Sequence, residues 1–218
     1  MSQVNLAVED EVPINPRREK KTSPRRTQAE RREQSEHRIL EAAIELVALK
    51  GAYAVTLAEI GERAGYSRGL PAHRFGSKTN LLKALAQYLS VNFSVFTDRA
   101  APAGLGRHRL EFMSEAYLLR KDKGWLRGYA LIMLIAEARL VDKELAAYMI
   151  KYNQEVVSYL KKNVEVAMDD GDISPSRNSS EIANFLLAVF RGAALLRIVD
   201  SDQDMTGLHR QVLVYLNN

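Results

Sequence analysis

The feature that most constrains the fold is a short stretch, residues 56–75, with the pattern of two brief helices around a glycine turn. Thr56 and Glu59 have the spacing of a capping box, in which each side chain bonds a free amide at the helix start. Helical spacing of apolar residues then continues to about Ala64. Gly65 permits a sharp reversal because it has no Cβ atom. We therefore expect two helices joined by a tight turn.

The second helix of this pair is expected to begin with Ser67 as its N-cap and to end near Phe75. Pro71 would then be its fourth residue, and its missing N–H would remove one hydrogen bond to the Ser67 carbonyl. A helix pair of this kind can insert the start of its second helix into the DNA major groove. Glycine-linked helix pairs also occur in many other folds, so the pattern needs further support.

The remaining sequence favours an all-α fold, because no strand-like alternation interrupts its helical spacing. A further helix is expected at residues 36–50, with helical character beginning somewhere within residues 25–36, and others are expected after the cap Ser77 and at about 107–120, 125–140, 142–168, 180–200 and 205–217. We expect three parts: a flexible basic arm (1–35), a helix-turn-helix domain (36–90) and a larger helical domain (91–218). Residues 101–104 (APAG) are the expected seam between the two domains.

The positive charge is confined to one part of the chain. Residues 16–83 hold 15 basic and 8 acidic residues, a net charge of +7, whereas residues 84–218 hold 16 of each. A basic first third next to a neutral remainder fits a protein whose first third meets a polyanion. The arm could follow a DNA backbone or enter a minor groove, or remain a solvated tail.

Several function classes are disfavoured by what the sequence lacks. It has no cysteine, which excludes disulfides and thiolate metal sites, and its four histidines have no metal-binding spacing. It has no phosphate-binding glycine loop and no nucleophile elbow. The acidic loop at residues 169–172 lacks the length and twelfth-position Glu of a calcium-binding loop. We therefore expect no enzyme activity, metal or cofactor, and a cytoplasmic protein with no secretory signal or membrane span.

Several short motifs together resemble the N-terminal domain of the tetracycline-repressor (TetR) family. They are residues 38–43 (RILEAA), 50–51 (KG), 56–61 (TLAEIG), 64–69 (AGYSRG), 75–78 (FGSK) and 81–82 (LL). The resemblance covers about residues 36–90, and beyond them only the helical layout is similar. It implies a homodimer that binds a palindromic operator in double-stranded DNA, usually as a repressor released by a small molecule. Under it, the larger domain would bind the ligand and form the dimer.

The resemblance also implies which residues contact DNA. Base readout would come mainly from Arg68, which can bond guanine at two points, and phosphate contacts from Thr56 and Lys78. The full candidate set is Thr56, Ser67, Arg68, Gly69, Leu70, His73, Arg74 and Lys78. One departure is clear: Pro71 and Ala72 stand where the family usually has an aliphatic residue and a phosphate-binding tyrosine. His73 and Arg74 are the expected substitutes.

The larger domain offers candidates for the dimer interface and the ligand site. Residues 180–200 are apolar nearly all round, so the helix needs a partner on both sides, and the last helix carries an apolar stripe. The expected interface residues are Phe185, Leu186, Val189, Phe190, Ala193, Leu196, Leu208, Val212 and Leu216. A pocket for an apolar or aromatic ligand, which the resemblance implies, would draw on Phe93, Phe112, Tyr117, Trp125, Tyr129, Met133, Tyr148 and Tyr152.

Two alternatives remain open at this stage. The chain could be a DNA-binding activator or global regulator without a small-molecule inducer, which a filled larger domain would favour. It could instead be an all-α interaction module that has lost DNA binding, with Pro71 and Ala72 as the sign of that loss.

Overall fold

The computed structural model describes residues 27–100, 106–119 and 124–217, and within them the side chains outside 91–100 and 124–125. These residues form nine α-helices and no strand, as the sequence predicts. The helices are α1 (Gln28–Lys50), α2 (Leu57–Arg63), α3 (Leu70–Phe75), α4 (Lys78–Ala100), α5 (Arg107–Leu118), α6 (Gly124–Val141), α7 (Lys143–Asp169), α8 (Ser179–Val199) and α9 (Thr206–Asn217).

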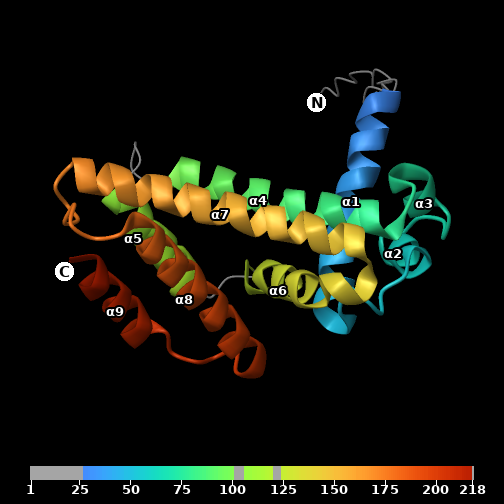
Figure 1. Cartoon of the computed structure of the whole chain (residues 1–218). Helices are drawn as coiled ribbons and strands as arrows, with labels where there is room; N and C mark the ends of the chain where they lie inside the picture. The colour runs from blue at the N-terminus through green and yellow to red at the C-terminus, as the bar shows by residue number, and fades with distance from the viewer. Residues whose placement is uncertain (1–26, 101–105, 120–123, 218) are drawn as a thin grey trace, which may run out of the picture.

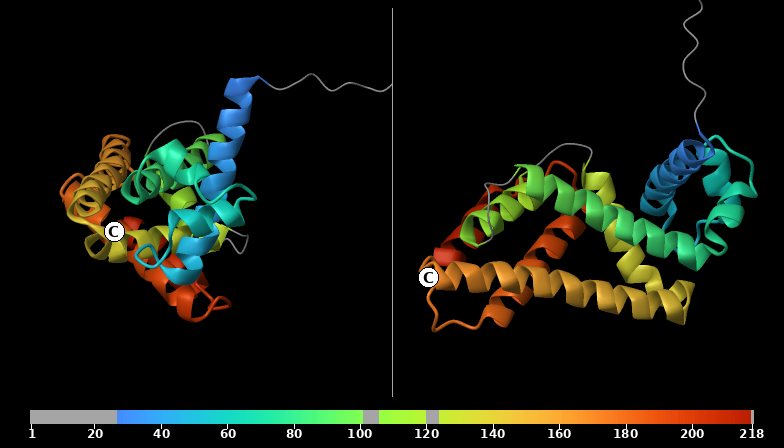
Figure 2. Two further views of the ribbon diagram at one scale, coloured as in Figure 1. Left: turned by 90° about the vertical axis from the view of Figure 1, so that its right-hand side faces the viewer. Right: turned by 90° about the horizontal axis from the view of Figure 1, so that it is seen from above.

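The short helices gather at one end of an elongated molecule. Figure 1 shows α2 and α3 at the right-hand end, with the start of α1 standing away from the body. Helices α4 and α7 run along the length of the molecule, and the view from above in Figure 2 shows them diverging from one another. Helix α8 crosses α7, and α9 lies beyond α8 at the opposite end from α3.

One hydrophobic cluster joins the short helices to the larger domain. It contains buried residues of α1, α2 and α4, together with Ala130 and Leu134 of α6 and Leu145 of α7. The leucines expected on the inner face of α4 all belong to it: Leu81, Leu82, Leu85 and Leu89. The helix-turn-helix region therefore shares its core with α6 and the start of α7, and α4 runs unbroken across the boundary expected at residue 90. The seam expected at residues 101–104 lies outside the described residues.

A second cluster holds the other end of the molecule together. It is built by α5, the second half of α7, α8 and α9, with Leu110, Leu160 and Leu186 completely or almost completely buried. Asn163 is also fully buried, and its side chain bonds both the Tyr159 carbonyl and the Gly106 amide. These bonds satisfy a buried amide group that would otherwise be costly.

Helix α1 begins earlier than the expected end of the arm. Thr27 and Glu30 form a capping box, since the Thr27 hydroxyl accepts the Glu30 amide and Glu30 accepts the Thr27 amide. Residues 28–35, which we assigned to a flexible arm, are therefore helical. Ser77 caps α4 as expected, because its hydroxyl accepts the Asn80 amide at 3.1 Å.

Helix α8 turns a different face to the outside from the one predicted. Five expected interface residues are buried inside one chain, where no second copy can reach them: Leu186, Phe190, Ala193, Val212 and Leu216. Phe185 and Leu196 are exposed, as the prediction requires, and Val189 and Leu208 are partly buried. The outer face of α8 continues through Ala188, Leu195 and Val199, which the prediction missed.

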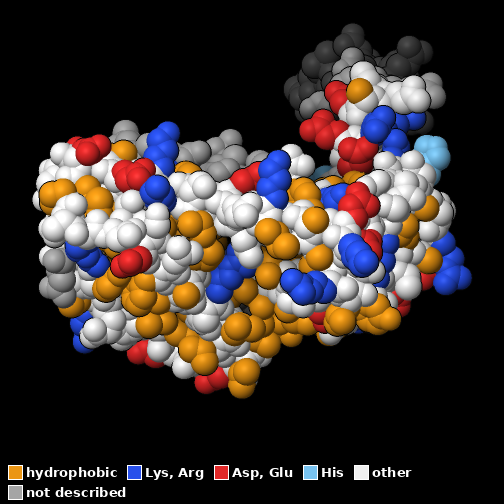
Figure 3. Space-filling view, in the orientation of Figure 1, with side chains coloured by type: hydrophobic (Ala, Val, Ile, Leu, Met, Phe, Trp, Pro, Cys, Tyr) orange, Lys and Arg blue, Asp and Glu red, His pale blue; other side chains and the backbone are white. Residues whose placement is uncertain are grey.

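Within the described residues, α8 is also the one helix whose length and composition would allow it to cross a membrane. Only 28% of that apolar stretch is buried inside the structure. Figure 3 shows hydrophobic side chains gathered on the lower part of the face where Figure 1 draws α8. The described residues of the chain thus leave much of this apolar helix uncovered.

Candidate nucleic-acid interface

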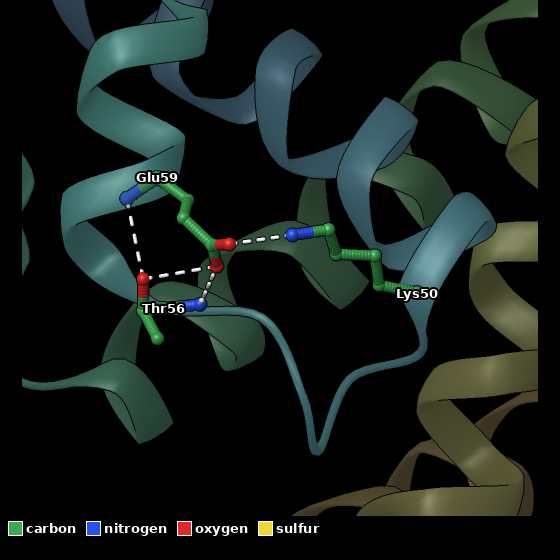
Figure 4. Close-up of polar contacts among 3 residues, drawn as sticks. All are labelled: Lys50, Thr56 and Glu59. Carbon is green, nitrogen blue, oxygen red and sulfur yellow. Dashed lines mark hydrogen bonds and ion pairs between the residues drawn. The ribbon is translucent and has the colours of Figure 1, made fainter.

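The start of α2 is fixed by a capping box with an added ion pair. Thr56 and Glu59 bond one another as predicted: the Glu59 amide donates to the Thr56 hydroxyl at 3.2 Å, and the Thr56 amide donates to Glu59 Oε2 at 3.0 Å. Figure 4 shows Lys50, from the end of α1, reaching the other carboxylate oxygen at 2.5 Å. The hydrogen bonds from Lys50 and Thr56 lower the pKa of Glu59 to about 2. One carboxylate thus ties α1 to α2.

This depressed pKa predicts a defined acid sensitivity. A carboxyl group whose folded pKa is lowered stabilises the fold above its ordinary pKa of 4.5 and loses that contribution as the pH falls towards 2. Glu59→Gln keeps a capping residue but cannot titrate. The Tm of the wild type should therefore fall more between pH 5 and pH 2 than the Tm of Glu59→Gln, as followed by circular dichroism. Glu33→Gln in α1 controls for the lost charge, and parallel curves for wild type and Glu59→Gln would contradict the assignment.

The turn between α2 and α3 differs from the prediction at Ser67. Helix α3 begins at Leu70, with Gly69 as an N-cap that makes no side-chain cap hydrogen bond. The Ser67 carbonyl accepts the Leu70 amide in a preceding turn, so Ser67 does not cap the helix. Pro71 is consequently the second helical residue, not the fourth, and its missing N–H is one that a first helical turn leaves unbonded in any case. The proline costs α3 no hydrogen bond.

Pro71 also has a packing role, against Gly61 of α2. A Cβ atom at Gly61 would lie 2.6 Å from the Ser67 carbonyl oxygen and 3.0 Å from Pro71 Cδ. The Gly61 carbonyl in turn accepts the Tyr66 amide at 2.9 Å. Gly65 has a φ of +77°, so it supplies the reversal expected of it. The two helices of the motif are therefore held in close backbone contact at Gly61.

The leading end of α3 presents several candidate residues to the outside. Arg68 has a side chain 72% exposed, with an ion pair to Glu62 at 3.0 Å. Ser67, Gly69 and His73 are exposed as well. An exposed ion pair of this kind is weak, so Arg68 can leave Glu62 for a stronger partner. Arg68 and His73 do not point into the core. Side chains turned into the core could not have contacted bases.

The other α3 candidates lie deeper. Leu70 packs against the first hydrophobic cluster, and Arg74 is partly buried, with an Nε atom that finds no hydrogen-bond partner among the described residues. Ala72 is exposed next to His73 and was not a candidate. Its methyl group is small enough to lie against a thymine methyl in a major groove. The sequence did not point to Ala72 as a DNA contact, because the family usually has a larger side chain at this position.

Thr56 and Lys78 are occupied by contacts within the chain. The Thr56 hydroxyl donates to Glu59 Oε2 at 3.0 Å, and Lys78 Nζ donates to the Tyr53 carbonyl at 2.5 Å. Desolvation lowers the pKa of Lys78, although the nearby carboxylates of Glu137 and Glu59 oppose this. The exposed Tyr53 ring lies under the Lys78 ammonium, 5.9 Å from it. Tyr53 is thus a polar surface group beside the predicted phosphate site. It belongs to no recognised motif, so the sequence did not indicate that it lies next to Lys78.

Most of the basic excess belongs to the arm. Residues 16–26 carry six basic residues and one acidic residue, and they lie outside the described residues. Residues 27–83 carry nine basic and seven acidic residues, so this region by itself has a net charge of only +2. Non-specific attraction to a polyanion, which scales with the number of phosphates neutralised, would therefore depend strongly on the arm.

Comparison with known families agrees with this geometry. Residues 39–85 match the family described as bacterial regulatory proteins, tetR family. This part of the chain is similar to the N-terminal domain of the TetR family. It therefore carries the DNA-binding helix-turn-helix domain of a family of transcriptional regulators. None of the curated proteins compared with the chain matches it.

Solved structures of transcriptional regulators share the fold over most of the chain. A putative TetR-family transcriptional regulator from Rhodococcus sp. matches with a TM-score of 0.74 and 19% identity, over 85% of this chain and 97% of that one. The regulator FadR of Bacillus subtilis, in complex with stearoyl-CoA, matches with 0.68 and 17%, over 84% and 97%. A putative transcriptional regulator from Saccharomonospora viridis, in complex with choline, matches with 0.70 and 17%, over 88% and 97%. At these identities the likeness establishes the fold.

Among the predicted ligand residues, the side chains that the structure describes do not all belong to one hydrophobic cluster. Tyr129, Met133, Tyr148 and Tyr152 belong to or pack against the first hydrophobic cluster, and Tyr117 packs against the second. Phe112 is partly buried in α5, and the side chains of Phe93 and Trp125 lie outside the described residues. Glu137 of α6 accepts the Tyr53 amide hydrogen at 2.8 Å. The larger domain thereby bonds the loop that precedes α2.

Proposed function

We propose that the chain is a homodimeric, cytoplasmic repressor that binds a palindromic operator and is released from it by a small-molecule ligand. The observation that carries the DNA-binding part is the outward position of Arg68 and His73 at the leading end of α3. The close contact of α3 with α2 at Gly61 holds this end in a fixed position, as base readout needs. Pro71 supports that contact, so it does not argue for a lost function.

Arg68→Ala tests base readout directly. An arginine bonded to guanine at two points contributes about 1–3 kcal/mol of discrimination, so the variant should lose its preference at one base position in each half-site. The measurement begins with selection of genomic fragments bound by the wild type and continues with affinities for single-base variants of the selected palindrome. Glu62→Gln is the matched control, because it removes the partner of Arg68 but leaves the arginine in place. Equal base preferences in Arg68→Ala and wild type would sink the assignment.

Lys78→Ala tests phosphate contact. A lysine that neutralises one phosphate contributes equally on all sequences, so its loss should weaken every duplex and lower the salt slope by about one unit. The variant also loses the bond to the Tyr53 carbonyl, so Tyr53→Ala, which retains that carbonyl, serves as its control. If the salt slope of Lys78→Ala equals that of the wild type, the Lys78 ammonium of the wild type stays on the Tyr53 carbonyl when DNA is bound.

Ligand-dependent release is supported by the fold and by the layout of the larger domain. Two proteins of the same fold were solved with small molecules, stearoyl-CoA in one and choline in the other. In this chain, α6 packs against α1, and Glu137 bonds the loop before α2. A change in the larger domain can therefore reach the DNA-binding helices through direct contacts.

Dimerisation is supported by the exposed face of α8. Phe185, Ala188, Leu195 and Val199 recur on one side of the helix, and Gly192, between them, has open space where a Cβ would stand. Small residues at the centre of an apolar face let two helices approach closely. A second copy of α8, related by a two-fold axis, would cover this face and would also give the two α3 helices the symmetry of a palindrome.

A further inference from the structure

Arg191 of α8 is a charged group that the structure leaves incompletely bonded. Its Nη2 atom donates to Asn153 Oδ1 of α7 at 2.8 Å. Its Nη1 atom is buried and has no hydrogen-bond partner among the described residues. The groups that act on its charge are the phenols of Tyr152 and Tyr117, and no carboxylate is among them. Among the described residues, the guanidinium therefore has a desolvated donor without a partner and no counter-ion.

Such an arrangement is unfavourable for folding alone. Arginine does not give up its proton in proteins, so the partial burial of Arg191 leaves its charge in place, and a desolvated charge without a counter-ion is destabilising. Desolvation accordingly lowers the pKa of Arg191. Locally unfavourable groups of this kind are typical of functional sites. A bound water molecule could satisfy Nη1, but it would not neutralise the charge.

The surroundings of Arg191 are aromatic and remain neutral. The Tyr117 ring of α5 stacks on Phe190, the neighbour of Arg191, with 4.8 Å between ring centroids. Tyr152 of α7 is buried, and its phenol bonds Ser90 of α4. Burial raises the pKa of both tyrosines, so both keep their protons at physiological pH. Residues of four helices, α4, α5, α7 and α8, thus meet near the Arg191 guanidinium.

Tyr159 of α7 is a second residue with an unsatisfied polar atom in this part of the structure. Tyr159 lies seven residues after Tyr152, two turns along the same face of the helix. Its hydroxyl is buried and has no hydrogen-bond partner in the described part of the chain. Val156, between the two tyrosines, packs against both hydrophobic clusters. The Tyr159 hydroxyl is thus a second buried donor without a described partner, further along the face of α7 that carries Tyr152.

We propose that Arg191 anchors a binding site for an organic carboxylate with an apolar body, between α5, α7 and α8. A guanidinium binds carboxylates with paired, charge-assisted hydrogen bonds, and the aromatic side chains around it suit an apolar body. The carboxylate supplies the missing counter-ion and accepts the hydrogen of Nη1. The inference rests on the proposed ligand-dependent release and names the class of its ligand.

The first test is the stability of the ligand-free protein. Arg191→Met replaces the cation with an apolar side chain of similar length, so the Tm should rise or stay unchanged once the unpaired charge is gone. Arg197→Met is the matched control on the same helix, because Arg197 donates to the backbone carbonyls of Tyr117 and Leu118. Its loss should lower the Tm. A clear fall in Tm for Arg191→Met as well would assign Arg191 a structural role and overturn the proposal.

The second test is binding of defined probes to the full-length protein. Octanoate and benzoate should raise the Tm of the wild type, whereas octanol and benzyl alcohol, which lack the charge, should not. Arg191→Met should weaken carboxylate binding by about 10–100-fold, the loss expected for hydrogen bonds between charged groups. Octyl phosphate distinguishes the anions: a stronger response to it than to octanoate would replace the carboxylate with a phosphate ester. No response to any anion, or equal responses in wild type and Arg191→Met, would overturn the proposal.

Operator binding separates this proposal from the proposed function. Arg191→Met without probe should bind the selected palindrome as tightly as the wild type, but octanoate should release only the wild type. If neither protein binds DNA, the proposed function fails, whatever the probes do to the Tm. If both bind DNA and neither responds to an anion, the carboxylate site fails and the DNA-binding function stands.

Discussion

Leu195→Glu is expected to convert the protein from a dimer to a monomer and to lower its affinity for a palindromic operator by at least about 100-fold. Leu195 lies at the middle of the outer face of α8, with 51% of its surface exposed in one chain. In the proposed dimer this face would be buried, and a buried carboxylate without a partner is strongly disfavoured. Each monomer would then bind a single half-site and lose the advantage of two linked contacts.

The measurement is the molar mass in solution by light scattering, together with operator affinity. The wild type should have twice the chain mass of 24.5 kDa, and Leu195→Glu should have the mass of one chain. Ile150→Glu is the matched control, since Ile150 on α7 is similarly exposed but lies on another helix. A dimeric Leu195→Glu with wild-type operator affinity would mean that something other than a second α8 covers this face.

The helices of this protein could be predicted from sequence because their signals are local. Capping residues such as Thr56 and Ser77 and the spacing of Leu81, Leu82 and Leu85 placed α2 and α4 correctly. Helix α1 begins within the range expected for it, residues 25–36, but the basic residues before Glu36 led us to extend the flexible arm to residue 35. The capping box at Thr27 and Glu30, which begins the helix, lies within that basic stretch.

The inner face of α8 could not be predicted because the helix carries apolar side chains on nearly all of its sides. Sequence spacing cannot tell which of two apolar faces its own domain covers. The structure decides this through α5 and α7, which bury the side that holds Leu186 and Phe190 and leave Leu195 and Val199, the latter 88% exposed, on the other side.

The DNA-binding residues were predictable in outline and not in their contacts. Arg68 and His73 are exposed as their positions in the motif suggested. The engagement of Lys78 with the Tyr53 carbonyl depends on a contact between residues 25 positions apart, which no local pattern encodes. Arg191 illustrates the same limit: an arginine within an apolar helix is visible in the sequence, but the described groups around it, two phenols and no carboxylate, come from the packing of four helices.

Gly61→Ala is expected to destabilise the protein by about 1–3 kcal/mol, the usual cost of forcing an extra methyl into a packed site. Its Cβ would stand 2.6 Å from the Ser67 carbonyl oxygen, a backbone atom that cannot rotate away as a side chain would. The turn and the start of α3 must therefore move outward. Because Arg68 follows directly after Ser67, operator affinity should fall together with the Tm in thermal unfolding and duplex-binding measurements.

The opposite sign is expected for the same substitution in another helix. Gly128 of α6 has open space around the position of a Cβ, so Gly128→Ala should stabilise the protein by about 0.5–1 kcal/mol through helix propensity alone. The double variant Gly61→Ala/Pro71→Ala separates the two obstacles at Gly61. It removes Pro71 Cδ, at 3.0 Å, but leaves the nearer Ser67 carbonyl, so most of the loss should remain. Full recovery would show that the proline ring alone sets the spacing between α2 and α3, and stabilisation by Gly61→Ala itself would mean that the two helices are not held in close backbone contact.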